Sequence, residues 1–540
     1  MVDGEFLTQI MPTDNSIDDV VIVGGGDVGL ATALALRELN PGLGISVVDD
    51  FSADPPAVGK STYQSILDLL HGFLGIPEDR FTRDVKPIWK GSVYFEDWCG
   101  YDPFHYTFDF FVQYPDRAAP KAADQYYFQY DTVAVDPEYR TVSEAMVEEG
   151  KSPVYFERNG HDRYQAVAYH LDLERFNSLL ADLCSERGVD TVDDRITDVD
   201  VSAGTVDALH SETTTYEADL YVDASGFNRV IKSELDAEFR TFDLPVDTAF
   251  TTKVDRPLSE AVPATVVESG DAGWFWGIDT FEFRDLGYVF SSKHTSDDEA
   301  AAEFIDHCDA DLSRRDLTRY EFDSGYYPAA WEGNCVAVGN AEGFVEPLQS
   351  TALTSALQSA ANLSIALSSN GRVDPNSARG LYNAWVERMW ESIYDFIAVH
   401  YRYGDGDTSF WEAAQSVPVG RRVERLEDHF DQCGYNTKLN PLNTPDPEEG
   451  PLPELAVIAP INFFIIMRNM GVESAFYEDN DITVDDDVRA DLEEFYDSME
   501  QRADQLLTVE EVYKGLLQRP EESGAGRTTT PDQLTNRMQD

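Results

Sequence analysis

Hydrophobic residues follow two different periods along this chain, which predicts strands first and helices later. Asp19–Val23 is an apolar run of high β propensity that ends in glycines, Leu30–Leu39 has helical spacing, and Ile45–Val48 is a second apolar run. This order predicts a strand–helix–strand unit near the start. Strand patterns and aromatic-rich loops alternate over about 85–335, and the spacing is mainly helical from Leu353 onward.

The same pattern divides the chain into parts. Asp172–Arg187 has the spacing of a helix and is followed by strands near 196–222. Strands mixed with helices in this way predict an α/β fold, in which a dinucleotide-binding part is interleaved with a mixed β-sheet substrate module and followed by a mainly helical module. The polar ends are expected to be disordered. The expected ranges are 17–360 for the first part with its sheet at about 85–335, 361–518 for the helical module, and 1–16 and 519–540 for the ends.

Charge is the strongest compositional signal. The 540 residues include 101 Asp and Glu against 40 Lys and Arg, which gives a net charge of −61 spread over most of the chain. Such self-repulsion destabilises a compact protein at low ionic strength but is screened within about 3 Å at 1 M salt. We therefore expect a protein adapted to a high-salt cytoplasm, and the same field disfavours nucleic acid as a partner. An acidic face for one basic partner is the alternative, and it would concentrate the charge locally.

No segment has the pattern of a membrane span or of a metal site. The most apolar stretch, Val457–Met467, contains Pro460 and falls short of the roughly 18 residues that a span needs, so we interpret it as core. The five cysteines are scattered without a CxxC pair, which predicts neither zinc nor a disulfide framework and is ordinary for a cytoplasmic protein.

A glycine motif follows the first expected strand. Gly24, Gly26 and Gly29 satisfy GxGxxG between that strand and the next helix, and Asp49 ends the following strand. The glycines permit a tight turn and close approach of the backbone to a pyrophosphate, whose charge lies at the helix N-terminus. The carboxylate of Asp49 can accept hydrogen bonds from ribose hydroxyls. The motif predicts a dinucleotide cofactor but does not distinguish NAD from FAD.

Two later strand-then-glycine segments favour FAD. One strand leads through Asp223 to Gly226, and another leads to Gly339 and Asn340. Turns this far apart in sequence resemble the later FAD-contacting turns of the p-hydroxybenzoate-hydroxylase-like flavoproteins, although each alone also fits an ordinary turn at a strand end. The resemblance implies that these four residues contact FAD.

Several segments, spread over roughly residues 18 to 475, together resemble the flavin-dependent halogenases, in particular the tryptophan-halogenase-like members. Residues 273–278, Gly-Trp-Phe-Trp-Gly-Ile, look like the family's WxWxI signature, and 287–292 follow as in the family. Residues 343–351 are similar to the segment that holds the halide and the active-site carboxylate, and 395–411 resemble the helical region beyond it. Lys90, between Trp89 and Gly91, stands where the family has its active-site lysine.

The resemblance implies a reaction sequence. Reduced FAD, supplied by a separate flavin reductase, would react with oxygen to a hydroperoxide, and chloride or bromide would attack its distal oxygen. The resulting hypohalous acid would move past Trp274 and Trp276, which separate flavin from substrate, to Lys90 beside an aromatic substrate. A lysine there either holds the hypohalous acid by a hydrogen bond or forms a haloamine. On residue type alone, the two tryptophans also fit a plain core, and Lys90 also fits a snorkelling surface group.

Several positions depart from the family pattern. Gln349 replaces the glutamate, and an amide cannot accept a proton near neutral pH; Glu346 is a candidate substitute. Ala352 replaces a glycine beside the halide-binding amide of Thr351, which either tightens or spoils that anion nest. Lys60 stands where the family usually has glutamate.

These departures leave three functions open. The leading hypothesis is an FADH2- and O2-dependent halogenase. The alternatives are an FAD-dependent monooxygenase or oxidoreductase without halide chemistry, and a flavin-binding protein without turnover. The aromatic cluster Phe104–Phe111 fits an indole, a phenol or only other side chains, so the substrate stays undefined.

Overall fold

The computed structural model describes residues 17–52, 59–108, 141–157, 160–163, 167–308, 310–368, 375–434, 458–476 and 486–518. The two ends expected to be disordered and Asp109–Phe111 of the aromatic cluster lie outside these residues. The first unit is strand β1 (Asp19–Val23), helix α1 (Asp27–Leu39) and strand β2 (Gly44–Asp49), as the hydrophobic pattern predicts. Helix α5 (Leu173–Glu186) is also at its predicted place, with Asp172 as its N-cap. The α/β fold with mixed sheets is confirmed.

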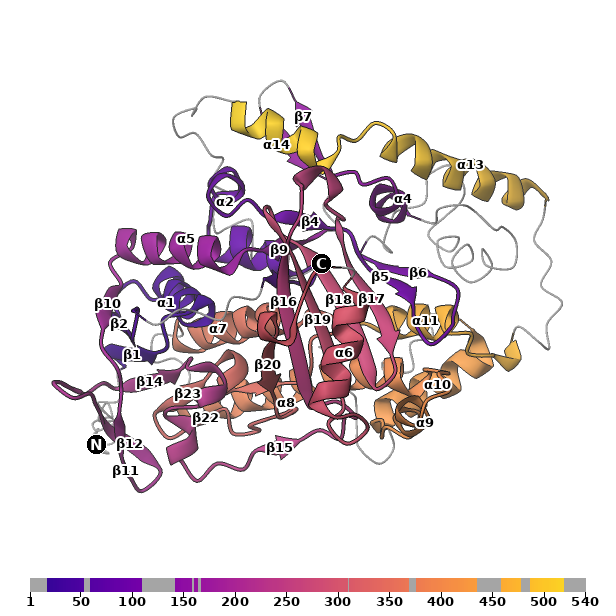
Figure 1. The fold of residues 1–540 in the computed structure, drawn as a ribbon. Helices are drawn as coiled ribbons and strands as arrows, with labels where there is room; N and C mark the ends of the chain where they lie inside the picture. The colour runs from indigo at the N-terminus through magenta and orange to yellow at the C-terminus, as the bar shows by residue number, and fades with distance from the viewer. Residues whose placement is uncertain are drawn as a thin grey trace, which may run out of the picture.

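A six-stranded, mostly parallel sheet is built around the first strand–helix–strand unit. Its order is β10-β2-β1-β14-β23-β22, and every neighbouring pair is parallel except β22 with β23. The strands added to the first unit are β10 (Asp190–Asp193), β14 (Leu220–Asp223), β22 (Trp331–Glu332) and β23 (Cys335–Ala337). Helices α5, α1 and α7 (Ala352–Ser368) lie beside one another against this sheet (Figure 1). Parallel strands of this kind bring their carboxyl ends to one edge.

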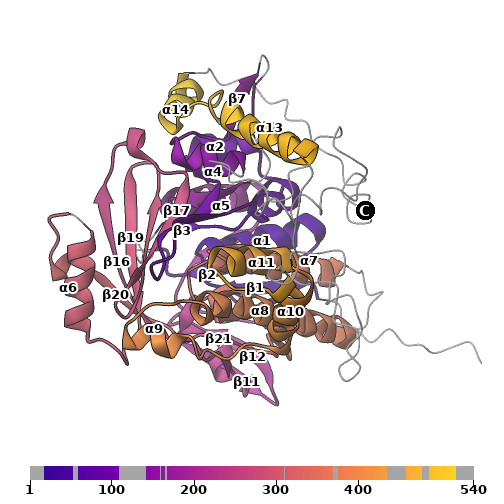
Figure 2. The same cartoon turned by 90° about the vertical axis from the view of Figure 1, so that its right-hand side faces the viewer.

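A seven-stranded sheet, mostly antiparallel, stands beside the first. Its order is β20-β16-β19-β18-β17-β5-β6, with β17 and β5 parallel. Helix α6 (Asp297–His307) covers its outer face (Figure 2), where Phe275, Tyr288 and Phe304 form a separate apolar cluster. The inner face joins the main core. The strands are β20 (Thr318–Glu321), β16 (Thr248–Asp255), β19 (Phe283–Phe290), β18 (Gly273–Asp279), β17 (Ala264–Gly270), β5 (Ser92–Asp97) and β6 (Phe104–Thr107).

The chain passes between the two sheets more often than the sequence indicates. Strand β10 lies within the expected substrate range of 85–335 but belongs to the parallel sheet, as does β14, whose following turn at Gly226 the resemblance assigned to FAD. Helix α7 begins at Ala352, in agreement with the helical spacing predicted from Leu353, and it runs through residue 360, where the expected helical module was to begin. A small sheet of β3 (Lys60–Ser61), β9 (Ala168–Leu171) and β4 (Ile88–Lys90) links the parts.

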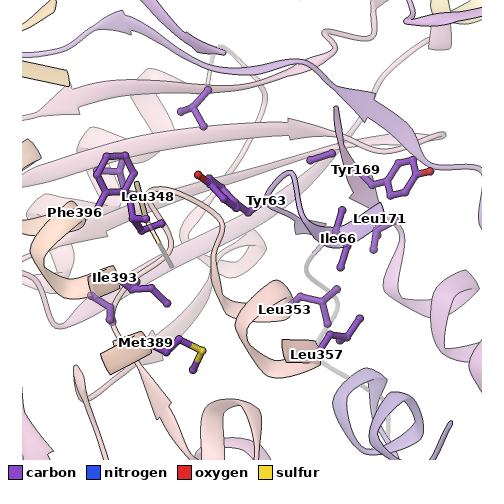
Figure 3. Packing of buried hydrophobic residues seen from close by; sticks show 14 of the residues in the cluster. Tyr63, Ile66, Tyr169, Leu171, Leu348, Leu353, Leu357, Met389, Ile393 and Phe396 are labelled. Atoms are coloured by element: carbon purple, nitrogen blue, oxygen red, sulfur yellow. The ribbon is translucent and has the colours of Figure 1, made fainter. Parts of the chain in front are cut away.

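The described part of the chain after residue 351 is mainly helical and closes one side of the core. Figure 3 shows Leu353 and Leu357 of α7 next to Ile66, and Met389 and Ile393 of α8 (Pro375–Arg402) on the side of Leu348, all within the main core. The stretch near Met467 is core, as expected, in α11. The helices are α8 (Pro375–Arg402), α9 (Ser409–Ala414), α10 (Arg421–Cys433), α11 (Pro460–Asn469), α13 (Asp486–Ala503) and α14 (Val509–Gln518). No helix among the described residues is long and apolar enough to cross a membrane.

The remaining described elements are short. The helices are α2 (Glu78–Val85), α4 (Val142–Glu148) and the single turns at Asp68–Phe73, Gly226–Asn228, Lys232–Glu234, Leu258–Glu260, Arg314–Asp316 and Gly339–Ala341. The strands are β7 (Val154–Glu157), β8 (Gly160–Arg163), β11 (Asp198–Ser202), β12 (Thr205–His210), β13 (Thr215–Tyr216), β15 (Arg240–Thr241), β21 (Gly325–Tyr326) and β24 (Gly343–Phe344).

Candidate active site

The three glycine turns lie together at one edge of the parallel sheet. Strands β1, β14 and β23 are neighbours, and each is followed by its turn, at Gly24, Gly226 and Gly339. The turns are joined directly, since the amide of Ala224 donates to the carbonyl oxygen of Val23 at 2.8 Å. Segments about 100 to 200 residues apart in sequence thus form one cofactor-sized edge, in the position where open α/β sheets bind ligands.

The backbone at this edge fits a dinucleotide. Gly24 has φ +113°, and a Cβ there would lie 2.4 Å from the carbonyl oxygen of Ala224. A Cβ at Gly29 would lie 1.8 Å from the carbonyl oxygen of Gly24, so both positions require glycine. A Cβ at Gly26 would meet nothing within 4 Å, which leaves open space at the first residue before α1. Open space at an amino-terminal helix end is what a pyrophosphate requires.

The acidic residues at this edge have different roles. The carboxylate of Asp49 accepts the amides of Gly25 at 2.6 Å and Asp50 at 2.9 Å, and it remains partly exposed. Its free lone pairs can accept ribose hydroxyls. The carboxylate of Asp223 is fully buried and accepts four donors of its own turn, including Ser225 Oγ at 2.6 Å and the amide of Lys232 at 2.8 Å. Asp223 therefore holds the Gly226 turn in shape. Because its carboxylate is occupied by these four donors, the backbone of the turn is the part that can contact a ligand.

The other turn residue predicted for FAD lies close to α1. A Cβ at Gly339, which has φ +62°, would lie 2.9 Å from Cγ1 of Val28. Asn340 follows in the same short turn and is partly exposed at this edge. Lys60 approaches the edge from β3, where its Nζ forms an ion pair with Asp27 Oδ2 at 2.5 Å.

Lys90 ends strand β4 and is completely buried. Its Nζ donates to Ser61 Oγ at 3.0 Å, to the carbonyl oxygen of Thr62 at 3.3 Å and to Ser350 Oγ at 3.1 Å. Because these partners are neutral, burial lowers the pKa of Lys90 well below its usual range. The alternative of a snorkelling surface lysine is therefore wrong.

The loop before α7 is conformationally unusual. Ser350 adopts φ +57°, a left-handed conformation that is rare for a residue other than glycine, asparagine or aspartate. Thr351 follows directly, and its carbonyl oxygen accepts the amide of Ser355 at 2.8 Å as α7 begins at Ala352. Successive amides after a left-handed residue, at the amino end of a 17-residue helix, suit a small anion such as a halide.

Gln349 pairs with a histidine that the sequence did not point out. Gln349 Nε2 donates to His400 Nε2 at 2.9 Å, and His400 Nδ1 donates to the carbonyl oxygen of Phe396 at 2.8 Å. This second bond fixes the tautomer, because a carbonyl oxygen only accepts. Burial lowers the pKa of His400 to about 4, so the ring is neutral. Gln349 Oε1 is buried and has no hydrogen-bond partner among the described residues.

Glu346 ties the same loop to one of the predicted barrier tryptophans. Trp274 Nε1 donates to the Tyr401 hydroxyl at 2.9 Å, and that hydroxyl bonds Glu346 Oε2 at 3.0 Å. Glu346 Oε1 accepts the amide of Leu348 at 2.8 Å. Burial raises the pKa of Glu346 to about 8, so this carboxyl holds its proton at neutral pH.

The two tryptophans share one face of β18. Trp274 is buried, whereas Trp276 is half-buried and lies over Gly287 of β19, where a Cβ would come within 2.2 Å of its ring. The close fit explains why a glycine stands in the strand opposite the motif.

An aromatic surround encloses Lys90 and Gln349. Lys90 Nζ lies 5.5 Å from the centre of the Phe108 ring, and Phe108 packs edge-on against Tyr63 at 5.7 Å. On the other side, His400 stacks on Phe95 at 5.7 Å. Part of the predicted aromatic cluster thus lines the site from β6 and the residue beyond it. The segment 395–411 that resembles the family includes His400 without giving it a role, and no pattern pointed to Ser61, because both side chains meet partners distant in the chain.

Comparisons with known proteins agree with this geometry. The model of the tryptophan halogenase family matches residues 19–441. Tryptophan 7-halogenase RebH of Lentzea aerocolonigenes is 27% identical over 452 residues, which cover 78% of this chain and 83% of that protein. The structure of BrvH, a flavin-dependent halogenase from Brevundimonas sp. BAL3, superposes with a TM-score of 0.77 at 27% identity, covering 93% of this chain and 100% of the other. That of MibH, a lathipeptide tryptophan 5-halogenase, gives 0.76 at 26% identity, covering 94% and 95%.

Proposed function

The chain belongs to the tryptophan halogenase family and is a flavin-dependent halogenase, and we propose that it transfers a halogen from hypohalous acid through Lys90 to a small aromatic substrate. Family membership favours this function over halide-free oxygenation and over flavin binding without turnover. The observation that carries the proposal is the buried Lys90 ammonium group held only by neutral oxygens beside Gln349.

FAD would lie along the edge formed by the three glycine turns. Gly24, Gly26 and Gly29 would hold the pyrophosphate, and Asp49 the ribose. The turns at Gly226 and Gly339, with Asn340, would bound the rest of the cofactor, with Asp223 holding its turn in shape. When bound there, reduced FAD from a separate flavin reductase would supply, with O2, the two-electron oxidising power needed to convert chloride or bromide to hypohalous acid.

The halide would bind the amides of Thr351 and Ala352 at the amino end of α7. Trp274 and Trp276 would form the wall between cofactor and substrate. Glu346, protonated and bonded to Tyr401, would fix the position of Trp274 and of the loop, rather than take a proton from the ring.

Gln349 would contact the substrate in place of the carboxylate that the family pattern has. Its buried Oε1 can accept a hydrogen bond, so it favours a ring that carries an N–H or O–H group, such as an indole or a phenol. Because a buried acceptor without a donor costs about 1–3 kcal/mol, such a substrate gains affinity over an unsubstituted ring.

The acidic composition supports an assay at molar potassium chloride or bromide. With a flavin reductase, indoles and phenols are screened by mass spectrometry for the halogen isotope pattern. Lys90→Met should lose halogenated product while still binding FAD. Lys253→Met, which changes a partly exposed lysine of β16, is the matched control and should keep its product.

Product at the wild-type rate from Lys90→Met would refute the role of the lysine. Oxygenated product from the wild type, with or without halide, would refute the halogenase proposal itself.

A further inference from the structure

We infer that Ser61, Thr265 and His170 form a proton relay through which Lys90 passes a proton to His170. This inference rests on the proposed role of Lys90 in halogen transfer. It adds positioning residues that lie outside the halide loop and the aromatic surround.

A continuous line of hydrogen bonds joins the two basic groups. Lys90 Nζ lies 3.0 Å from Ser61 Oγ, Ser61 Oγ lies 2.9 Å from Thr265 Oγ1, and Thr265 Oγ1 lies 3.0 Å from His170 Nε2. The residues come from the linking sheet, β3, β4 and β9, and from β17 of the seven-stranded sheet. Lys90 and His170 are fully buried, Thr265 is buried, and Ser61 is partly exposed.

His170, at the end of the line away from Lys90, determines which group donates in each hydrogen bond. His170 Nδ1 faces the backbone carbonyl oxygen of Asp279 at 3.2 Å, so it must carry the hydrogen, and Nε2 must accept. Thr265 therefore donates to His170, Ser61 donates to Thr265, and Lys90 donates to Ser61. Every donor points away from the lysine, which is the arrangement that a stepwise transfer of one proton from Lys90 to His170 requires.

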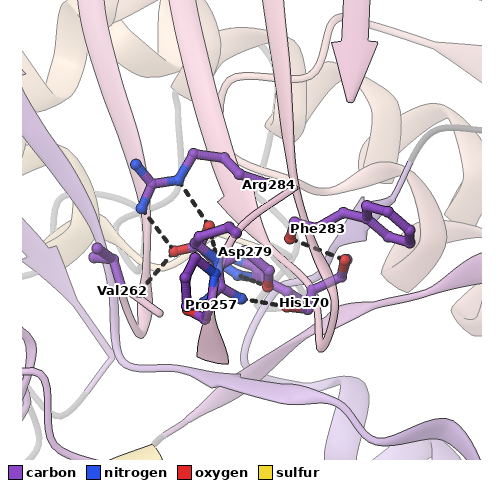
Figure 4. Close-up of polar contacts among 8 residues, drawn as sticks. His170, Pro257, Val262, Asp279, Phe283 and Arg284 are labelled. Carbon is purple, nitrogen blue, oxygen red and sulfur yellow. Dashed lines mark hydrogen bonds and ion pairs between the residues drawn. The ribbon is translucent and has the colours of Figure 1, made fainter. Parts of the chain in front are cut away.

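Electrostatics oppose a positive charge on Lys90 and His170 at the same time. Burial lowers the pKa of His170 well below its usual range and the charges of Lys90 and Arg256 lower it further, whereas the hydrogen bond to the Asp279 carbonyl raises it; the contribution of Lys90 is removed once Lys90 has given up its proton. Since burial also disfavours the charged Lys90, the transfer moves a buried charge and does not create a second one. Figure 4 shows His170 beside Asp279, whose carboxylate forms ion pairs with Arg256 at 2.8 Å and Arg284 at 2.8 Å.

One further charged pair lies next to the relay. Lys60, the neighbour of Ser61 in β3, is bound to Asp27 at 2.5 Å and points toward the cofactor edge. The carboxylates near the relay are thus already paired with cations, which leaves neutral His170 as the proton acceptor for Lys90.

The chemistry balances at each step. The Lys90 ammonium gives a proton to neutral His170, which leaves a free amine and an imidazolium. The amine attacks hypohalous acid, so an N–X bond forms, the O–X bond breaks and water leaves with the amine proton. The ring then takes the halogen as the N–X electrons return to nitrogen. The proton lost by the ring and the one held by His170 restore the ammonium and the neutral imidazole.

Thr265→Val removes the relay hydroxyl with little change of shape, whereas Thr265→Ser keeps it. Thr82→Val is the matched control, because the buried Thr82 hydroxyl has no hydrogen-bond partner among the described residues. Hypohalous acid is added directly to the FAD-bound protein, and halogenated product is followed against pH at saturating aromatic substrate.

Thr265→Val should slow transfer about 100-fold at pH 7. Its rate should rise toward that of the wild type as higher pH deprotonates Lys90 directly, and the substrate KM should not change. Thr265→Ser and Thr82→Val should follow the wild-type profile. His170→Phe should reproduce the Thr265→Val profile, which keeps the test valid if the valine variant does not fold.

A wild-type profile in both Thr265→Val and His170→Phe would overturn the relay and leave proton exchange at the partly exposed Ser61. The result with Lys90→Met distinguishes failure of the relay from failure of the proposed role of Lys90. If Lys90→Met loses its product while Thr265→Val keeps the wild-type rate, only the relay is refuted. If Lys90→Met forms product at the wild-type rate, the role of Lys90 in halogen transfer is refuted, and the relay with it.

Discussion

Replacing Glu346 with glutamine tests whether this buried carboxyl is neutral at physiological pH. A protonated carboxyl and an amide both present one acceptor oxygen and one donor, so glutamine mimics the protonated form toward Leu348 and Tyr401. The substitution removes one titration and leaves the contacts similar.

The magnitude follows from the pKa. Burial raises the pKa of Glu346 from 4.5 to about 8, so between these values the folded protein holds a proton that the unfolded chain has released. Stability therefore falls as pH rises, by about 1.4 kcal/mol per pH unit. The contribution is fully present below pH 4.5, is lost by pH 8 and amounts to about 5 kcal/mol over that interval.

Urea unfolding at fixed molar potassium chloride measures this difference. From pH 5 to pH 8, Glu346→Gln should gain stability relative to the wild type by about 4 kcal/mol. The buried Glu342, whose pKa burial raises to about 7, is common to both proteins and cancels. Glu412→Gln on the exposed face of α9 is the control, and its stability should stay within about 0.5 kcal/mol of the wild type, as for most surface substitutions. A pH-independent difference for Glu346→Gln would refute the protonated state.

Two more substitutions test the cofactor edge and the pocket. Gly29→Ala should lose FAD in a flavin fluorescence titration, since its Cβ would lie 1.8 Å from the carbonyl oxygen of Gly24, whereas Gly72→Ala meets nothing within 4 Å and should bind normally; equal affinities would contradict the FAD site. Gln349→Glu places a carboxylate next to Ser350 and so near Lys90, and should raise the pKa of that lysine and move the acidic limb of the halogenation profile to higher pH. An unchanged limb would show that residue 349 does not act on Lys90.

The sequence predicted the parts of the fold that local patterns control. The strand β1 and the helix α5 match their predicted ranges because apolar period and capping act over a few residues. Helix α7 begins at Ala352, close to the start of the helical spacing predicted from Leu353, and it continues across the expected module boundary at 360. The assignment of β10 to the parallel sheet could not be predicted, because pairing partners are chosen by tertiary packing and not by the strand's own residues, whereas the place of β14 agrees with the FAD-contacting turn that the resemblance implied after Asp223.

The candidate site divides in the same way. The resemblance identified Lys90 and Gln349 as candidate site residues. In the structure Gln349 lies in the loop before α7, and Lys90 bonds Ser350 of the same loop. His400 and His170 needed the structure, because a buried histidine acquires its tautomer and its pKa from partners such as Phe396 and Thr265. Those contacts cannot be predicted from the properties of the individual residues.

Gln349 and Lys90 are electrostatically consistent with each other. A carboxylate at position 349 would stand one residue from Ser350, which bonds the lysine, and would favour its ammonium form. With an amide there, burial acts on Lys90 unopposed by any of its three neutral partners, and its pKa is low. An amide in place of the carboxylate thus removes a proton acceptor for the ring. It also shifts the protonation equilibrium of Lys90 toward the neutral amine. A relay that carries the lysine proton to His170 keeps the amine neutral while the ring is halogenated, and the nitrogen that gives up the halogen then takes the ring proton, so this route needs no carboxylate at position 349.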